Sequence, residues 1–242
     1  MRFTIKVAGI PVEVESLHNY FPSLCKNYIC DEEPQFKVIS SNEKIDAERM
    51  LFKDNGNYSN AFLETVSIHR EISEKILWKD VLLMHGSAVA VGGKAYIFSA
   101  YSGTGKSTHT RLWREVLPEK GHKITMINDD KPFIKFTENG IYVCGSPWNG
   151  SYRLDTNIMV PVGGIAFLSR SETNSIKHIT PEKALPHLII HIHRPSDAEG
   201  IRKVLKLGER MAHEIPCYEL KCNMDPEAAI VSYEGMTGEI LF

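Results

Sequence analysis

The segment AYSGTGKST, from Ala100 to Thr108, constrains this 242-residue chain more than any other feature of its sequence. Gly103 and Gly105 can adopt backbone angles that other residues avoid, so successive N–H groups can converge on a phosphate. Lys106 places an ammonium where the β- and γ-phosphate charge of a nucleotide would lie, and the Ser107 hydroxyl is a ligand for Mg²⁺. The segment therefore predicts a phosphate-binding loop, with a nucleotide as its ligand.

The residues on either side of the loop fit this interpretation. An apolar run from Ala95 to Phe98 predicts a strand entering the loop, and a helix beginning near Gly105 would point its positive end at the same anion. The usual pattern begins with Gly, whereas Ala100 holds that place here, and a small residue still lets the chain turn. The alternative is a Gly-rich turn that only resembles the motif. The predicted nucleotide-binding residues are Ser102, Gly103, Thr104, Gly105, Lys106, Ser107 and Thr108.

Two strand-like runs, Val81–Val91 and Lys94–Ser99, are separated only by Gly92-Gly93, which predicts a tight hairpin. The strand that feeds the loop would then have an antiparallel neighbour. In ordinary P-loop NTPases this strand lies in a parallel sheet reached through helical crossovers. The sequence therefore favours a different kind of P-loop protein.

The first 58 residues differ from the rest, and we expect a small β-rich N-terminal part over residues 1–58 and a P-loop core over residues 59–242. Alternating apolar residues in Phe3–Val7 and Ile10–Val14 predict a hairpin, and helical spacing predicts an amphipathic helix over Asn60–Trp78 that links the two parts. Further predicted strands are Phe36–Ile39, Lys123–Ile127, Phe133–Phe136, Ile141–Cys144, Val160–Leu168 and Ile215–Leu220, and further helices begin at Thr180-Pro181, at a capping box in Ser196–Glu199 and at Asp225-Pro226.

Two adjacent carboxylates, Asp129 and Asp130, follow the predicted strand Lys123–Ile127. A carboxylate in this place can share Mg²⁺ with Ser107. Two of them allow one to hold the metal while the other accepts the proton of an attacking hydroxyl. The alternative is an Asp-Asp turn between strands.

Three further residues are candidates for the acceptor side of such a site. His85 lies in the run paired with the loop strand, where its imidazole can stabilise charge near the phosphates, although a core histidine is an equal alternative. Trp148 stands among turn residues and can form one wall of an acceptor pocket, with Asn149 as a polar anchor. Its alternative is a Trp that folds back into the core.

Other charged and metal-ligating residues give weaker signals. Three arginines are candidates for a cation on the transferring phosphoryl group, but nothing singles one out and a surface ion pair is the favoured role for each. Three histidines near residue 190 lack a further ligand at convincing spacing and are interpreted as solvated helix residues. These residues are Arg153, Arg170 and Arg194, and His187, His191 and His193.

Composition bounds the class of protein. The chain is 43% apolar and 24% charged, with a formal net charge of −2, which argues against general nucleic-acid or membrane-surface binding. The N-terminus alternates at strand period and does not predict a signal peptide. The five cysteines form no Cys-x-x-Cys pair, which favours reduced thiols and a cytoplasmic location.

Together, His85-Gly86, SGTGKST at 102–108 and Asp129-Asp130 resemble the HPr kinase/phosphorylase family and its relatives with the phosphoenolpyruvate-carboxykinase-type P-loop fold. NDDKP at 128–132 and GSPWNG at 145–150 look like the small bacterial HPr-kinase-related proteins. The resemblance implies an α/β fold with a mixed, largely antiparallel sheet, and ATP and Mg²⁺ as cofactors.

The resemblance also implies roles for individual residues. Lys106 and Ser107 would hold ATP and Mg²⁺, Asp129 would be the catalytic base, Asp130 a metal ligand, and His85 an assisting group near the acceptor. The chain lacks the HPr kinase signature for dephosphorylation and the ligand set of a true carboxykinase, so neither of those reactions is implied.

We therefore expect an ATP-dependent kinase that phosphorylates a hydroxyl, a serine in a small molecule or a peptide. The alternatives are a nucleotide-binding sensor without turnover, an HPr-type protein serine kinase and a plain nucleotide hydrolase. A homo-oligomer is compatible with the resemblance.

Overall fold

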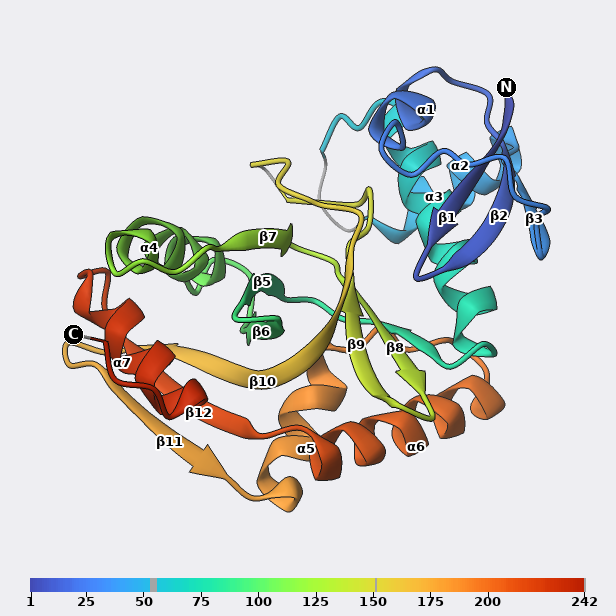
Figure 1. Cartoon of the computed structure of the whole chain (residues 1–242). Helices are drawn as coiled ribbons and strands as arrows, with labels where there is room; N and C mark the ends of the chain where they lie inside the picture. Colours follow the sequence, from blue (N-terminus) through green and yellow to red (C-terminus); the bar gives the residue numbers. More distant parts are fainter. Residues whose placement is uncertain (53–55, 151, 242) are drawn as a thin grey trace.

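The computed structural model describes residues 1–52, 56–150 and 152–241. A nine-stranded sheet forms the centre of the molecule (Figure 1), with the strand order β4-β8-β9-β10-β6-β5-β7, and with β12 beside β10 and β11 beside β12. Its strands are β4 (Val81–Leu83), β5 (Ser87–Val91), β6 (Lys94–Ser99), β7 (Thr125–Asn128), β8 (Phe133–Thr137), β9 (Gly140–Cys144), β10 (Met159–Arg170), β11 (Ser175–Ile179) and β12 (Cys217–Cys222).

The sheet is mixed and largely antiparallel, as the sequence predicts. Among the described strands of this sheet only β10 makes parallel pairings, with β6 on one side and β12 on the other. All other neighbours are antiparallel. The long strand β10 thus joins the hairpin β8–β9 to the strand that feeds the phosphate loop.

The predicted hairpin before the loop is confirmed. Val91 pairs with Lys94 across the two-residue turn Gly92-Gly93, whose φ angles are +59° and +76°. Positive φ at both central residues is the geometry that matches strand twist and selects glycine. The predicted run Val81–Val91, however, forms two strands, because β4 pairs with β8 and β5 pairs with β6.

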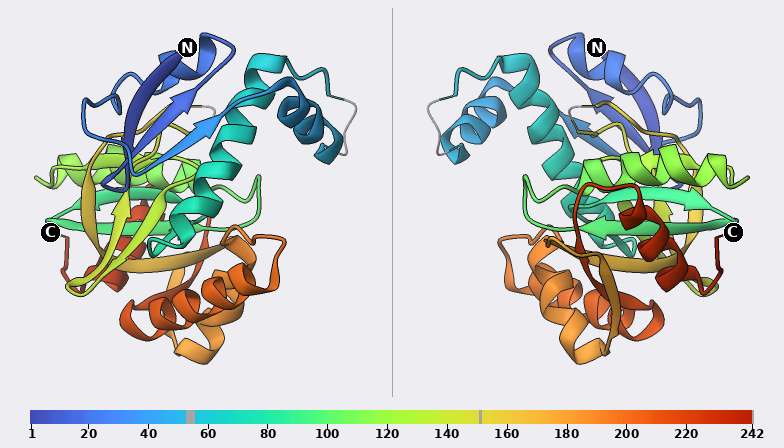
Figure 2. Two further views of the ribbon diagram at one scale, coloured as in Figure 1. Left: turned by 90° about the vertical axis from the view of Figure 1, so that its right-hand side faces the viewer. Right: turned by 90° about the vertical axis from the view of Figure 1, so that its left-hand side faces the viewer.

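Two pairs of helices cover the sheet. Buried residues of α5 (Pro181–His191) and α6 (Ala198–Glu214) pack in one hydrophobic cluster with the sheet. Buried residues of α4 (Lys106–Glu119) and α7 (Glu227–Thr237) belong to a second cluster that contains the alternate residues of the same strands. Figure 2 shows α5 and α6 together at the lower side of the sheet in both views.

The N-terminal part contains a three-stranded sheet of β1 (Arg2–Val7), β2 (Ile10–Glu15) and β3 (Phe36–Ile39). The helices α1 (Tyr20–Leu24), α2 (Asn42–Leu51) and α3 (Asn60–Leu77) lie with it, and α3 runs from this part toward the central sheet (Figure 2). Its hydrophobic cluster also contains Phe133 and Trp148 from beyond residue 58. The division at residue 58 stays a prediction, and residues 53–55 just before it lie outside the described part.

Some local features differ from the predictions or were missed by them. Neither α1, α2 nor β11 was predicted. The N-cap of α6 is Asp197, whose Oδ1 accepts a hydrogen bond from the N–H of Gly200 at 2.7 Å, one residue later than the predicted capping box.

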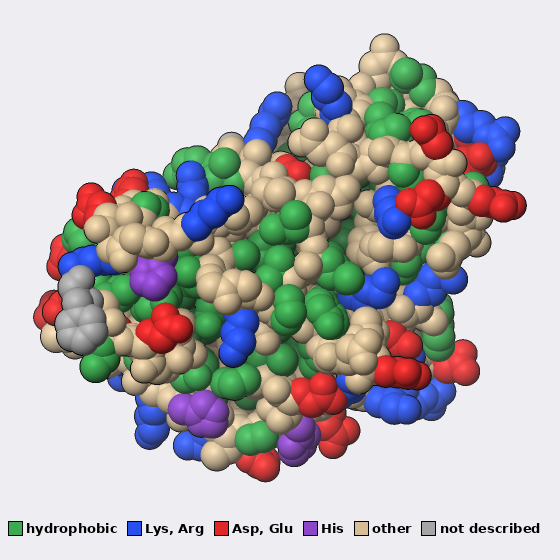
Figure 3. Space-filling model, in the orientation of Figure 1, with side chains coloured by type: hydrophobic (Ala, Val, Ile, Leu, Met, Phe, Trp, Pro, Cys, Tyr) green, Lys and Arg blue, Asp and Glu red, His purple; other side chains and the backbone are tan. Residues whose placement is uncertain are grey.

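The surface gives one further observation. On the face in Figure 3, Lys and Arg side chains are interspersed with Asp and Glu, as the small net charge leads us to expect. Across residues 1–52, 56–150 and 152–241, we find no helix with the length and apolar character that crossing a membrane requires.

Candidate active site

The predicted phosphate loop joins the end of β6 at Ser99 to the start of α4 at Lys106. Gly103 (φ +78°) and Gly105 (φ +127°) both have positive φ angles, and a Cβ at either position would meet no atom within 4 Å. Glycine is therefore needed there for backbone conformation rather than for space. Ala100 is not among the residues with positive φ, which explains why alanine can stand where the usual motif has glycine.

The Lys106 ammonium lies against the loop itself. Its Nζ donates hydrogen bonds to the carbonyl oxygens of Ala100 (3.0 Å) and Tyr101 (3.4 Å). Burial lowers the pKa of Lys106, and the negative charge of Asp130 acts in the opposite direction. A buried ammonium held by two neutral carbonyls can gain a stronger, charge-assisted partner when an anion enters the loop.

Arg170 holds the loop from the neighbouring strand. β10 runs parallel to β6 and ends at Arg170. The guanidinium donates hydrogen bonds to the carbonyl oxygens of Gly103 and Thr104, the latter at 3.2 Å. The sequence did not single out this arginine, because its position depends on the register between β10 and β6.

Asn128, the last residue of β7, fixes the turn that carries the two carboxylates. It is fully buried, and its Nδ2 donates to the carbonyl oxygens of Ser146 (3.0 Å) and Trp148 (3.2 Å). Its Oδ1 accepts hydrogen bonds from the backbone N–H groups of Asp130 (2.9 Å) and Lys131 (2.6 Å). This positioning role was also missed from the sequence, although an Asn before an Asp-Asp pair is a recognisable turn signal.

Asp129 is buried and is only 3% exposed. Its Oδ1 accepts a hydrogen bond from the N–H of Gly150, while its Oδ2 has no hydrogen-bond partner among the described residues. Burial raises the pKa of Asp129, and backbone hydrogen bonds from Gly150 and Leu154 act against that shift. A carboxylate oxygen that is buried and unpartnered, with a raised pKa, is suited to accept a proton.

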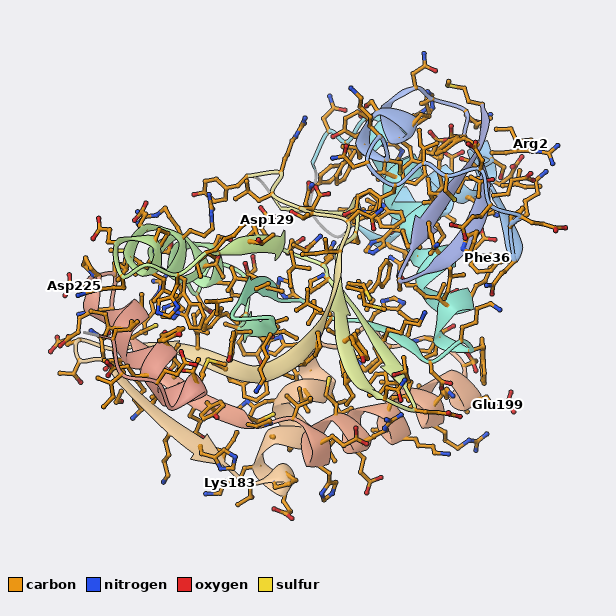
Figure 4. All side chains as sticks on the ribbon, in the orientation of Figure 1. Arg2, Phe36, Asp129, Lys183, Glu199 and Asp225 are labelled. Carbon is orange, nitrogen blue, oxygen red and sulfur yellow. The ribbon has the colours of Figure 1, made fainter. Side chains whose placement is uncertain are left out.

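Asp130 lies in a different environment. Burial disfavours its charged form, but the hydrogen bond from His85 and the charges of Lys131, His85 and Lys106 outweigh burial and lower its pKa. The Nε2 of His85 lies 3.3 Å from its Oδ1. Two adjacent carboxylates are thus shifted in opposite directions, which is the pattern expected when one acts as a base and the other stays ionised. Figure 4 shows Asp129 at the end of β7, beside α4.

His191, at the end of α5, lies next to His85. The centroids of the two rings are 6.1 Å apart, and the N–H of His85 donates to the carbonyl oxygen of His191 at 2.7 Å. Burial, together with the charges of His85 and Lys106, lowers the pKa of His191 to about 4. The prediction of a solvated helix residue was wrong for His191, which is 8% exposed because the end of α5 packs on the sheet. It was also wrong for His193, which lies beyond the end of α5 and has a buried Nε2.

Trp148 and Asn149 occupy the loop after β9, as predicted, but their side chains already have partners. The Trp148 ring stacks on His69 and Phe21 and is 7% exposed, and its Nε1 donates to the carbonyl oxygen of Thr65 at 3.0 Å. The amide of Asn149 donates to Asp155. Trp148 therefore belongs to the core between the N-terminal part and the sheet, which is the alternative the sequence left open. An acceptor-binding role for either residue stays a prediction.

Most of the predicted residues meet at one cavity of about 420 Å³, which we call the phosphate cavity. It contains both predicted catalytic residues, both predicted metal ligands and all of the predicted nucleotide-binding residues except Thr104. The lining residues are His85, Ser102, Gly103, Gly105, Lys106, Ser107, Thr108, Asp129, Asp130 and Gly150.

The donors in the phosphate cavity fit Mg²⁺ bound together with a nucleotide. The Asp130 carboxylate and the Ser107 hydroxyl supply the oxygen ligands that Mg²⁺ prefers. Within the described ranges no group of three or more His, Cys, Asp or Glu side chains could hold a metal ion by itself. Phosphate oxygens would therefore have to complete the coordination, as they do in many nucleotide sites.

Comparisons with known proteins add a distant structural similarity. No family model matches this chain, and no curated protein gives a match. One of the solved structures that match is the Hpr(Ser) kinase/phosphatase from Coxiella burnetii, at a TM-score of 0.32 and 10% sequence identity, covering 62% of this chain and 91% of that chain. At such values the function has to be inferred from the residues of this chain.

Proposed function

We propose that this chain is an ATP-dependent kinase that transfers the γ-phosphoryl group to a hydroxyl, such as that of a serine, in a small molecule or a peptide. One observation carries the proposal. A glycine-based phosphate loop with a buried lysine faces two adjacent carboxylates whose pKa values are shifted in opposite directions, and all of them line one cavity.

A second cavity provides a place for the nucleoside. This nucleoside pocket has a volume of about 390 Å³ and shares Gly103, Gly105 and Thr108 with the phosphate cavity. Cys222 and the exposed Met224 offer apolar contacts for a base, and Arg170 adds a positive charge close to the loop. A nucleotide whose phosphates occupy the phosphate cavity would place its base here.

The chemistry follows from these positions. Bound Mg²⁺ would neutralise charge on the β- and γ-phosphate oxygens. Lys106 exchanges its loop carbonyls for those oxygens, and Asp129 takes the proton of the attacking hydroxyl through its unpartnered Oδ2. The bond from the hydroxyl oxygen to γ-phosphorus forms as the bond to the β,γ-bridging oxygen breaks, and ADP leaves. Positioning and charge stabilisation supply most of the rate in such transfers.

The test begins with nucleotide binding. Lys106→Ala should abolish the thermal shift that Mg-ATP gives to the wild type and leave the apoprotein folded, because the ammonium is the only cation of the loop itself. Lys123→Ala, which removes an exposed lysine outside the cavity, should keep the shift. Equal shifts in Lys106→Ala and the wild type would refute nucleotide binding at the loop.

Turnover is tested with labelled ATP and three acceptor panels: amino and hydroxy acids, short serine peptides and folded serine proteins. Label in one of the first two panels is expected. Label only in inorganic phosphate would favour a hydrolase, label only in folded protein a protein serine kinase, and binding without any turnover a nucleotide sensor.

A further inference from the structure

A third cavity, which we call the histidine cavity, adjoins the phosphate cavity through His85. It has a volume of about 240 Å³ and lies between α3, the residues around β4, and the end of α5. Its polar lining consists of His69, Arg70, His85, Lys131, His191 and His193, and its remaining lining residues are aliphatic.

The charge of this lining has one sign. Arg70 and Lys131 are cations, four further side chains are imidazoles, and no carboxylate lines the cavity. Arg70 is fixed by two hydrogen bonds to Glu48, at 2.9 and 2.7 Å, from outside the cavity. The nearest ion-pair contact of the Lys131 ammonium is Asp130 Oδ2 at 3.9 Å, which is too long for a hydrogen bond. Lys131 can therefore take a closer anionic partner.

Two of the lining histidines, His69 and His193, each carry a buried imidazole nitrogen without a partner. The Nε2 atoms of His69 and His193 are enclosed and make no hydrogen bond among the described residues. His69 is only 5% exposed, and its ring is held by stacking on Trp148. Leaving a buried polar atom unpaired is destabilising, so a small movement of either ring that brought its Nε2 to a polar ligand would be favourable.

The surroundings of both imidazoles are electropositive. Burial lowers the pKa of His69 and of His193, and the cations Lys131 and Arg70 lower both further. Glu48 acts in the opposite direction on the pKa of His193, and Glu74 Oε1 lies 4.0 Å from its Nε2. An anion placed among these groups would be stabilised by the two cations and by hydrogen bonds from the imidazoles.

The position of the cavity relates it to the proposed reaction. His85 lines both the histidine cavity and the phosphate cavity, and Lys131 directly follows the proposed metal ligand Asp130. A molecule with its anionic end near Lys131 and His69 can therefore place a hydroxyl next to His85, where the phosphate cavity begins. The cavity is smaller than the roughly 300–1,000 Å³ of sites for drug-sized ligands, which favours a molecule of a few carbon atoms.

We propose that the histidine cavity binds the carboxylate of the acceptor, and that the acceptor is a small hydroxy acid or an N-acylated serine with a free carboxylate. This inference rests on the proposed kinase function, because it names the substrate class of that site. Lys131 is the specificity-determining residue, and His69 lines the same cavity and reports its occupation.

Matched probes that differ only in charge test the inference. The pairs are glycerate with glyceramide, and N-acetylserine with N-acetylserinamide. With labelled ATP, we expect kcat/KM for at least one acid to exceed that of its amide by about tenfold or more, the effect of one charge-assisted hydrogen bond. Lys131→Met should reduce that ratio to about threefold or less and still give a Mg-ATP thermal shift at saturating Mg²⁺, whereas Lys123→Met should keep the ratio.

A binding measurement without nucleotide separates this inference from the kinase proposal. NMR of ¹⁵N-histidine protein should show a shift of the His69 Nε2 resonance, assigned with His69→Gln, on addition of the acid but not of the amide. If Mg-ATP does not bind but the acid still moves this resonance, the kinase proposal fails and the carboxylate site stands. Equal transfer to acid and amide, a preference retained in Lys131→Met, or a His69 resonance unmoved by both acids would overturn the carboxylate site.

Discussion

The Nε2 of His85 lies 3.3 Å from Oδ1 of Asp130, and this contact links the segment between β4 and β5 to the turn after β7. The backbones meet at the same place, because the N–H of Gly86 donates to the carbonyl oxygen of Asp130 at 2.9 Å. The hydrogen bond from His85 is the largest of the effects that lower the pKa of Asp130 against its burial. His85 thus favours the ionised form of the proposed metal ligand.

His85→Ala is therefore expected to weaken the binding of Mg²⁺, while the contacts of the loop with the nucleotide stay intact. Without the imidazole, Asp130 loses the hydrogen bond that orients its carboxylate and favours its ionised form, so the carboxylate is less well positioned to bind a cation. The Mg²⁺ concentration that half-saturates ATP binding should rise about three- to tenfold, the effect of losing one hydrogen bond to a charged group. A Mg²⁺ titration at fixed ATP measures it.

The control for this experiment is His213→Ala, which removes an exposed histidine from the last turn of α6. It should leave the Mg²⁺ midpoint unchanged. If His85→Ala also left it unchanged, the contact with Asp130 would not support cation binding.

Arg170 provides a test of the loop geometry. Its guanidinium bonds two loop carbonyl oxygens, and a lysine at this position keeps the charge but cannot make the same pair of planar contacts. Arg170→Lys should weaken Mg-ATP binding about threefold to tenfold, measured by isothermal titration calorimetry. Arg114→Lys, on the exposed face of α4, serves as the control. Wild-type affinity in Arg170→Lys would mean that the charge alone matters, and Arg170→Ala would then have to show the loss.

The parts of the site that the sequence predicted are those in which one short segment determines the geometry. The glycines of the loop need positive φ, the Gly92-Gly93 turn selects a hairpin, and a polar pair after an apolar run marks the end of β7. Each of these signals is local, so no knowledge of the tertiary structure was required.

The parts that the sequence did not predict depend on packing between distant segments. Arg170 reaches the loop only through the register of β10 against β6, and His191 meets His85 only because α5 packs on the sheet. Trp148 packs in the hydrophobic cluster of the N-terminal part. The helix α1 has only the residues Tyr20–Leu24 and no side-chain cap, so neither periodicity nor a cap was available to indicate it.

Protonation of a buried histidine should make stability depend on pH. His109 on α4 is 2% exposed, its Nε2 lies 2.8 Å from Ser232 Oγ, and burial lowers its pKa to about 3. The unfolded chain takes up a proton on this group below about pH 6.5, whereas the folded chain does not until about pH 3. The free energy of unfolding should therefore fall as the pH drops through this interval.

His109→Gln removes this group's contribution, so its free energy of unfolding should fall less between about pH 7 and pH 5, by up to about 1.4 kcal/mol per pH unit below about 6.5. Urea unfolding at several pH values measures the slope. Other buried histidines keep some slope in the variant, so the comparison is with His213→Gln, which should follow the wild type. Parallel curves for His109→Gln and the wild type would contradict the assignment.

Substitutions at the two carboxylates should have different effects on phosphoryl transfer and on Mg²⁺ binding. In Asp129→Asn the proton acceptor is lost, and phosphoryl transfer should fall by about 10²-fold or more. Mg-ATP binding should stay nearly intact, because the proposed metal ligand is Asp130. Asp130→Asn should instead weaken the Mg²⁺ dependence of ATP binding and transfer, because it removes the proposed metal ligand.

The free energy of unfolding of Asp129→Asn gives a second test of this residue. Burial raises the pKa of Asp129, so the folded state disfavours its ionised form, and at neutral pH the buried charge is destabilising relative to the unfolded chain. Removing that charge should leave the free energy of unfolding equal to or above that of the wild type near pH 7. The difference should shrink as the pH falls through the raised pKa and Asp129 becomes neutral. A variant that keeps wild-type turnover would rule out Asp129 as the base and make His85 the next candidate. A large loss of stability near pH 7 would instead mean that ionised Asp129 holds the Gly150 and Leu154 backbone in place.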